Sequence, residues 1–228
     1  MIPISDYPPE RRSTPIVMPS LVVINVLVFI YELVLGQGMD RFLLAYGTIP
    51  YEISHGVDIP PHIPIPVYST LLTSMFLHAN LLHIGGNMLF LWVFGDNVED
   101  QIGHVRFLVF YLLCGVIAGL SQVAISPDAR VPAVGASGAI AGVLAAYFIL
   151  FPRAQVRTLL FFGIFFTITR ISAVFLIGFW IVLQFILGIV ALGSVDGGGV
   201  AYFAHVGGFI AGLALIQIFR RRDEIPQF

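Results

Sequence analysis

The sequence predicts an all-α polytopic membrane protein with about six transmembrane helices, and its length and composition carry this prediction. The chain has 228 residues, of which 58% are hydrophobic and only 11% are charged, and its mean hydropathy is +0.94. A soluble globular protein carries about 25% charged residues, so this chain cannot cover itself with a polar surface. Each span requires ~20 mostly apolar residues, which leaves room for six spans and short loops but not for a separate soluble domain.

Six apolar runs, separated by loop residues, define the predicted spans. They cover residues 18–35, 81–94, 107–125, 135–150, 171–192 and 200–219. The first run is not followed by a small-residue cleavage site, so we expect a retained span rather than a signal peptide. Cys114, the single cysteine, lies in the third run and has no intramolecular partner for a disulfide.

The connecting segments differ in polarity. Residues 1–15 form a short polar tail, and residues 39–67 are too polar and proline-rich to span, so we expect them to lie partly in the membrane interface. Residues 69–77 are expected to form a short helix that leads into the second span. Residues 153–170 are flanked by arginines and are short for a span, which favours a loop with an interfacial helix.

The basic residues favour an even number of spans. The chain has eleven positively charged residues, all of them arginine. With six spans, the side that holds both termini carries nine of them and the other side carries only Arg41 and Arg130. Because cytoplasmic loops are enriched in Lys and Arg, both termini are predicted to be cytoplasmic. Residues 16–220 then form one membrane domain, and residues 1–15 and 221–228 form cytoplasmic tails.

A short stretch of small residues, Gly135-Ala136-Ser137-Gly138, opens the fourth span. With six spans, the second, fourth and sixth all run from the outside to the cytoplasm, so their first residues lie at similar depth. Ionisable residues within membrane spans are rare and usually functional. The sequence therefore predicts a polar site in the outer half of the bilayer, formed by His78, His83, Asn87, Ser137 and His205.

These side chains suit an acyl-transfer reaction. Ser137 becomes nucleophilic when a base takes its proton, and His205 can act as that base and later protonate the leaving group. His83 and Asn87 are four residues apart and therefore share a helix face. Together with the backbone N–H of Ser137 they can form an oxyanion site, in which one donor is typically worth ~10²–10³ in rate.

Each member of this set also has a purely structural interpretation. Small-residue clusters, and G-x-x-x-G pairs such as Gly208 and Gly212, usually bring membrane helices into close contact. A lone histidine or asparagine more often satisfies a neighbouring group by hydrogen bonding. His78 precedes its span, so we expect a structural role in which it ties down the first loop. The common depth and complementary chemistry of the set favour catalysis over these separate explanations.

Other catalytic chemistries fit the sequence less well. An H-E-x-x-H motif is absent, and His78 and His83 are five residues apart rather than four, so we expect no metal and no cofactor. No two carboxylates lie in the middle of spans, which excludes an aspartic protease pair. Asp128 and Asp196 lie in loops, and nothing in the sequence places either near His205. We therefore expect a Ser–His dyad.

Taken together, the motifs resemble those of the rhomboid family of intramembrane serine proteases. Residues 78–87 look like the family's H-x4-H-x3-N element, and residues 135–138 are similar to its G-x-S-G nucleophile motif. Residues 204–212, which begin with Ala204 and His205, look like its A-H-x-x-G element with a following glycine. Residues 95–99 resemble the G-x-x-x-E that ends the second helix. The motifs occur in the expected order, and the resemblance covers about residues 16–220.

The resemblance implies a six-helix rhomboid-like bundle that hydrolyses peptide bonds in or near transmembrane segments of membrane-protein substrates. Ser137 would be the nucleophile and His205 the base, and the oxyanion would be stabilised by Asn87, His83 and the Ser137 amide. The helix at residues 171–192 and the loop that follows it resemble the region proposed to gate substrate access. Structural support of the site would come from His78, Gly135, Gly138, Gly208 and Gly212.

Two positions depart from the family pattern. Residues 37–67 lack the tryptophan of a Trp-Arg pair that some members carry. Ala141 stands where some members place a tyrosine against the base histidine, so another group must orient His205. The alternative function is a non-catalytic rhomboid-like binding protein or a transporter, although we find no internal repeat typical of transporters.

The remaining expectations concern surroundings and partners. The partners would be transmembrane protein substrates and the lipid bilayer, with no nucleic acid. Because hydrolysis requires water, we expect a polar cavity above Ser137, covered by the loop before the last span. We expect a bacterial cytoplasmic membrane, since no organelle-targeting extension is present.

Overall fold

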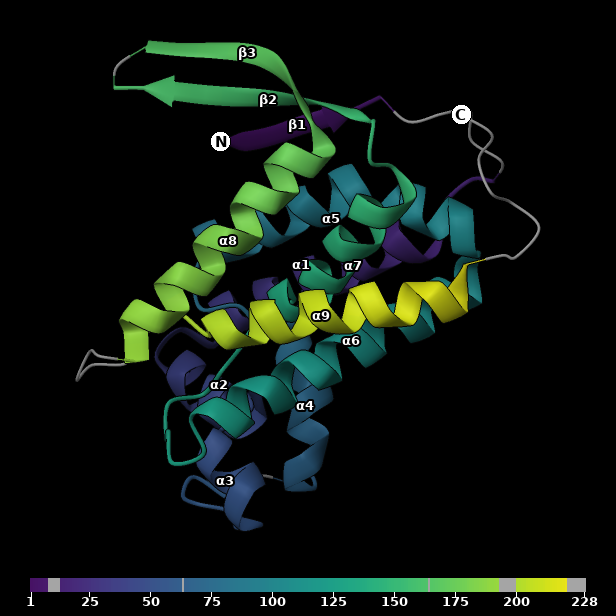
Figure 1. Cartoon of the computed structure of the whole chain (residues 1–228). Helices are drawn as coiled ribbons and strands as arrows, with labels where there is room; N and C mark the ends of the chain where they lie inside the picture. Colours follow the sequence, from purple (N-terminus) through teal and green to yellow (C-terminus); the bar gives the residue numbers. More distant parts are fainter. Residues whose placement is uncertain (8–12, 63, 164, 193–199, 221–228) are drawn as a thin grey trace.

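The computed structural model is a helical bundle with a small β-sheet at one end (Figure 1), and it describes residues 1–7, 13–62, 64–163, 165–192 and 200–220. The longer helices are α1 (Val17–Leu35), α5 (Leu81–Ile102), α6 (His104–Ile125), α7 (Ser137–Leu150), α8 (Ala173–Leu192) and α9 (Tyr202–Phe219). Three short helices lie between α1 and α5: α2 (Met39–Tyr46), α3 (Pro50–His55) and α4 (Thr70–Thr73). The strands are β1 (Ile2–Asp6), β2 (Gln155–Phe162) and β3 (Phe165–Ser172).

The helices confirm a polytopic, mostly helical membrane protein. Within the described part of the chain, four helical stretches are long and apolar enough to cross a membrane: Val17–Tyr46, His104–Ile125, Ala173–Leu192 and Tyr202–Phe219. A fifth results if Val67–Phe76 and Leu81–Ile102, which meet at 80°, count as one bent span. α7 has only 14 residues, or about 21 Å of helix against a hydrocarbon core of ~30 Å. The count of spans thus depends on how α5 and α7 are treated.

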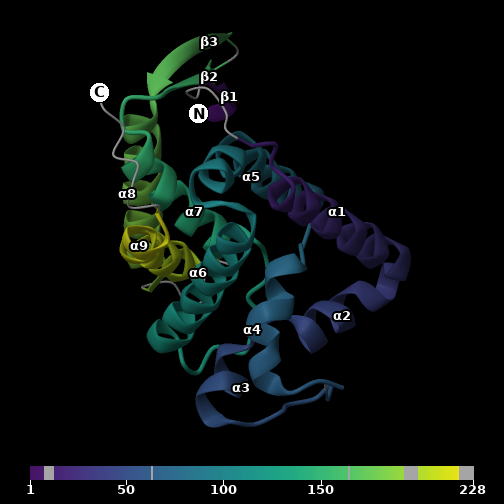
Figure 2. The same cartoon turned by 90° about the vertical axis from the view of Figure 1, so that its right-hand side faces the viewer.

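α7 occupies the centre of the bundle. Ten of its 14 residues are buried, and it contacts α5, α6, α8 and α9, which surround it in both Figure 1 and Figure 2. A Cβ atom added to Gly212 of α9 would lie only 2.6 Å from the Cα atom of Gly142 in α7. The small residues therefore allow direct backbone contact between α7 and α9. This contact sets the spacing of the two helices that carry Ser137 and His205.

Residues 153–170 contain most of a β-hairpin, so the predictions of an interfacial helix here and of an all-α fold were wrong. β2 and β3 pair antiparallel, and β1 pairs antiparallel with β2, so the N-terminal tail also contains a strand. The hairpin sequence is rich in Val, Thr, Ile and Phe, which favour strands. Gly163 turns the chain with a φ of +64°, a conformation that glycine adopts without steric penalty. β3 leads directly into α8, as Figure 1 shows.

The second predicted span was too short, because α5 continues through the acidic segment to Ile102. Glu99 is fully buried there, and its carboxylate accepts N–H bonds of 2.8, 2.9 and 2.6 Å from Ile16, Val17 and Met18. The first N–H groups of a helix lack partners within it, and a carboxylate is favourable at that end. The acidic segment therefore looks like a loop in the sequence, but it is helical, and its Glu99 binds the N–H groups at the start of α1.

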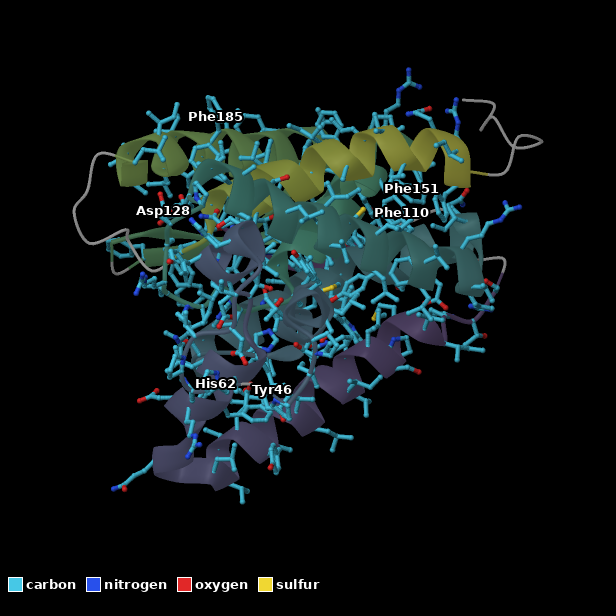
Figure 3. All side chains as sticks on the ribbon, turned by 90° about the horizontal axis from the view of Figure 1, so that it is seen from below. Tyr46, His62, Phe110, Asp128, Phe151 and Phe185 are labelled. Carbon is cyan, nitrogen blue, oxygen red and sulfur yellow. The ribbon has the colours of Figure 1, made fainter. Side chains whose placement is uncertain are left out.

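The connections alternate between the two ends of the bundle. Figure 3 shows Asp128, in the connection between α6 and α7, at one end of the bundle, whereas Phe110 and Phe151 lie toward the other. Ser137 directly follows the connection between α6 and α7, so it lies near the end of the bundle that holds Asp128. The chain enters the candidate site from that end.

Candidate active site

Ser137 is the first residue of α7, and the turn before it depends on Gly135. Gly135 has a φ of +120°, which side-chain-bearing residues rarely adopt. Its N–H donates to the carbonyl oxygen of Ser74 at 2.9 Å, which ties the turn to the segment before α5. Ala136 is fully buried, while Ser137 is partly exposed. The turn therefore presents the serine hydroxyl at the edge of the packed core.

His205 of α9 lies directly against Ser137. Its Nε2 atom is 2.7 Å from Ser137 Oγ, a hydrogen-bonding distance, and only 9% of the residue is exposed. The two residues are 68 positions apart in sequence. They meet because the glycines of α7 and α9 allow the two backbones to touch. The structure thus brings together the two residues predicted to form the dyad.

Two residues of α8 hold His205 from its other side, and the sequence reasoning missed both. The Nδ1 atom of His205 lies 2.8 Å from Oε1 of Gln184. The Trp180 ring lies 5.7 Å from the imidazole, with an angle of 38° between the ring planes. Trp180 therefore supplies the aromatic contact that Ala141 cannot.

A sequence signal for these two residues was available. Trp180 and Gln184 are the only residues of α8 whose side chains carry hydrogen-bonding groups. They are four positions apart, so they share one face of the helix. Polar side chains within an apolar span usually face the bundle interior.

His83 and Asn87 of α5 converge on the backbone beside Ser137. A Cβ atom added to Gly135 would lie 2.6 Å from Nε2 of His83 and 3.4 Å from Nδ2 of Asn87. The start of α5 is fixed by Asn80, whose side chain accepts the N–H of His83 at 2.9 Å. The two predicted oxyanion donors are thus adjacent to the turn that positions the serine.

His78 contacts Asn87 directly, and it also ties the site to α1. The Asn87 side-chain amide donates to Nε2 of His78 at 2.9 Å. The backbone N–H of His78 lies 3.2 Å from one carboxylate oxygen of Glu32. Both His78 and Glu32 are fully buried. Glu32, an acidic residue inside the first apolar run, was not among the residues predicted to form the site.

The predicted structural glycines lie at the helix contacts around the dyad. A Cβ atom on Gly138 would clash with Cβ of Ala118 in α6, at 2.6 Å. A Cβ atom on Gly208 would lie 2.9 Å from the carbonyl carbon of Gly138. These glycines therefore allow close packing, which is the structural meaning that the sequence also allowed.

The two loop aspartates do not join the dyad within the part of the chain that is described. Asp128 lies 3.7 Å from His55, a residue of α3, in an exposed ion pair. Asp196 and the glycine-rich loop at residues 194–199 lie outside the described residues, as does the loop expected to cover the site.

A cavity of about 100 Å³ lies between α5, α7, α8 and Met1 at the N-terminus. Phe90 and Trp180 both line it, and their ring centroids are 6.4 Å apart. Because Trp180 also contacts His205, the cavity reaches to within one side chain of the dyad. Its lining is apolar: Met1, Phe90, Leu144, Leu176, Ile177, Phe179, Trp180 and Leu183.

Comparison with known proteins agrees with these features. A sequence profile of the rhomboid domain matches residues 66–222. The chain is 42% identical over 76 residues to Rhomboid protease GluP of Bacillus subtilis, which covers 33% of this chain and 14% of that protein. It is 26% identical over 244 residues to RHOMBOID-like protein 1 of Arabidopsis thaliana, which covers 98% of this chain and 58% of that protein. Rhomboid protein 1, mitochondrial, of Saccharomyces cerevisiae is 33% identical over 96 residues, or 40% of this chain and 28% of that protein.

The chain spans less than two thirds of the length of each of these relatives. The matched domain nevertheless covers well over half of the chain, and it contains α5, α7, α8 and α9, which together carry the candidate site. On this match the chain belongs to the rhomboid family.

Proposed function

We propose that the protein is an intramembrane serine endopeptidase in which Ser137 and His205 form the catalytic dyad. The distance of 2.7 Å between Ser137 Oγ and His205 Nε2 is the observation that carries this proposal. A hydroxyl at this distance can pass its proton to the imidazole as it attacks a carbonyl carbon. Membership of a family that includes a relative named a rhomboid protease supports the same chemistry.

The reaction would proceed in two steps. In the first, Ser137 Oγ attacks the scissile carbonyl while His205 takes its proton, and the imidazolium then protonates the leaving amine. In the second, His205 activates a water molecule, which hydrolyses the acyl-enzyme and releases the serine. No metal is required, because the serine and histidine supply both the nucleophile and the proton transfer.

Asn87, His83 and the backbone N–H of Ser137 would stabilise the oxyanion. The side-chain amide of Asn87 has two N–H groups, so one can bind His78 while the other faces the developing charge. His78 would then fix the orientation of Asn87 rather than touch the substrate. Donors held in this way need little reorganisation when charge develops.

The substrate would be a transmembrane segment that reaches the dyad between α5 and α8. The apolar cavity between these helices supports this route, since Trp180 lines it and its apolar lining suits an apolar side chain. We further propose six spans with both termini in the cytoplasm, because the arginine distribution favours that topology. In this arrangement, residues 16–220 form the membrane domain, and residues 1–15 and 221–228 are cytoplasmic tails.

For the location we propose a bacterial cytoplasmic membrane. The likeness to a Bacillus subtilis protease supports it, although other relatives are named as mitochondrial or chloroplastic. Fractionation of the native source, followed by immunodetection, tests this point.

A fluorophosphonate probe tests the dyad directly in detergent. Wild-type protein should be labelled, whereas Ser137→Ala should not be, and His205→Ala should lose labelling and cleavage of a model transmembrane substrate while it still folds. Equal labelling of wild type and Ser137→Ala would remove Ser137 from the mechanism. Near wild-type cleavage by His205→Ala would do the same for His205.

A further inference from the structure

We propose that Gln184 is a positioning residue that selects the reactive tautomer of His205. This inference rests on the proposed protease function. The observation behind it is the 2.8 Å contact between Nδ1 of His205 and Oε1 of Gln184, on the opposite side of the ring from Ser137.

The tautomer argument follows from the geometry of the ring. To accept the Ser137 proton, Nε2 of His205 must present its lone pair, so the imidazole proton must be on Nδ1. An acceptor beside Nδ1 stabilises that tautomer, and Oε1 of Gln184 is such an acceptor. If the Gln184 amide were rotated, its NH₂ group would donate to Nδ1 and favour the tautomer with the proton on Nε2. In that tautomer, Nε2 has no free lone pair and cannot take the Ser137 proton.

Other polar groups around His205 do not replace Gln184. His83 of α5 lies on the oxyanion side, and Tyr202 precedes His205 on α9 with its ring edge-on to the imidazole at 6.5 Å. Asp128 instead lies 3.7 Å from His55 at the end of α3. Among the described residues, Gln184 is the one hydrogen-bond partner recorded for Nδ1 of His205.

The position of Gln184 on α8 couples this orientation to the packing of the helix. The first part of α8 is anchored in the bundle, since Ala173, Leu176 and Ile177 are buried and Ala173 N–H donates to Ala154 at 2.9 Å. The part that follows is largely exposed. The contacts of Gln184 and Trp180 with His205 therefore depend on how this part of α8 packs against α9.

Three variants in the full-length protein test the proposal. Gln184→Leu removes the acceptor, and the loss of one such hydrogen bond should lower kcat by about tenfold with little change in KM. Gln184→Glu keeps an oxygen acceptor beside Nδ1, and an ionised carboxylate has no N–H or O–H group to donate. Its kcat should therefore lie within about threefold of the wild-type value. Phe185→Leu is the matched control, because its side chain is 49% exposed and points outward from α8 (Figure 3); it should leave kcat unchanged.

A spectroscopic measurement separates this inference from the protease function. In ¹⁵N-histidine-labelled protein, the His205 signals, assigned by their loss in His205→Asn, should report a proton on Nδ1 in wild type and in Gln184→Glu. In Gln184→Leu they should report a mixture of tautomers. An unchanged tautomer in Gln184→Leu would overturn the positioning role even if the protease is active. The expected tautomer shift in a protein without fluorophosphonate labelling would instead support the role of Gln184 and refute the proposed function.

Kinetics supply a second way to overturn the role. If Gln184→Glu is as slow as a folded Gln184→Leu, the side chain acts by packing and not by accepting the Nδ1 proton. If Gln184→Leu retains wild-type kcat, the contact has no influence on the base.

Discussion

Replacing Gly212 by alanine should disturb the proposed dyad from a distance, without changing either Ser137 or His205. Gly212 lies seven positions after His205 on α9, facing Gly142 of α7. An added Cβ atom would lie 2.6 Å from the Cα atom of Gly142 and 2.9 Å from the Cβ atom of Ala145. These obstacles are the backbone and a rigid methyl group, so they cannot rotate away.

The magnitude follows from these distances. Non-bonded carbon atoms approach to roughly 3.5 Å, so α7 and α9 must separate locally by about 0.9 Å. Added to the 2.7 Å between Ser137 Oγ and His205 Nε2, this gives about 3.6 Å, which is no longer a hydrogen bond. A misplacement of ~1 Å in a catalytic pair can reduce the rate by about 10²-fold. This overpacking should also lower the free energy of unfolding by about 1–3 kcal/mol.

Cleavage of a model transmembrane substrate and thermal unfolding in detergent measure both effects. Gly178→Ala on α8 is the matched control, because its nearest neighbour is Cε2 of Phe148 at 3.9 Å, an ordinary contact. Alanine favours helix over glycine by up to about 1 kcal/mol, so the control should be as active and at least as stable as wild type. If Gly212→Ala cleaves and unfolds like Gly178→Ala, the backbone contact does not set the geometry of the dyad.

Three further changes probe the oxyanion site and the buried polar contacts. Asn87→Ala should lower kcat by about 10²–10³-fold; steady-state cleavage measures this, and a loss below tenfold would exclude Asn87 as a donor. Glu99→Gln should lower the free energy of unfolding by about 2 kcal/mol, because the amide keeps only one acceptor oxygen for the N–H groups at the start of α1. Thermal unfolding measures this effect, and an unchanged melting temperature would contradict the prediction. Asp6→Ala removes the carboxylate that accepts the hydrogen bond of the Tyr147 hydroxyl at 2.6 Å. Unfolding in detergent should show that the free energy of unfolding falls by about 1–3 kcal/mol. Equal stability of the variant and wild type would show that this contact between β1 and α7 does not stabilise the fold.

The sequence predicted the helical membrane class and the residues that meet at the site, because both depend on local features. Apolar runs of sufficient length identify membrane helices, since the bilayer requires a fixed thickness of hydrocarbon contact. Counting the spans gave a common depth to Ser137 and His205, which the fold indeed brings together at 2.7 Å. Their catalytic roles stay a prediction until activity is measured.

The structure of two segments was predicted wrongly, and in each case polar or mixed residues contact residues that are distant in the sequence. The acidic end of α5 looked like a loop, but Glu99 accepts N–H groups from the start of α1, more than 80 residues away. The hairpin looked like an interfacial helix because its arginines and apolar residues suit either structure. Pairing with β1, whose partners in β2 are distant in sequence, completes the sheet.

By itself, the sequence determined the chemistry available to this protein: a serine between small residues, and histidines and an asparagine in otherwise apolar helices. Only the tertiary structure decided which groups contact His205. Trp180 and Gln184 reach His205 because α8 crosses beside α9, and Glu32 reaches His78 because α1 packs near the start of α5. Which helix faces meet depends on helix packing, in which contacts between distant residues are formed together, and no single segment encodes that choice.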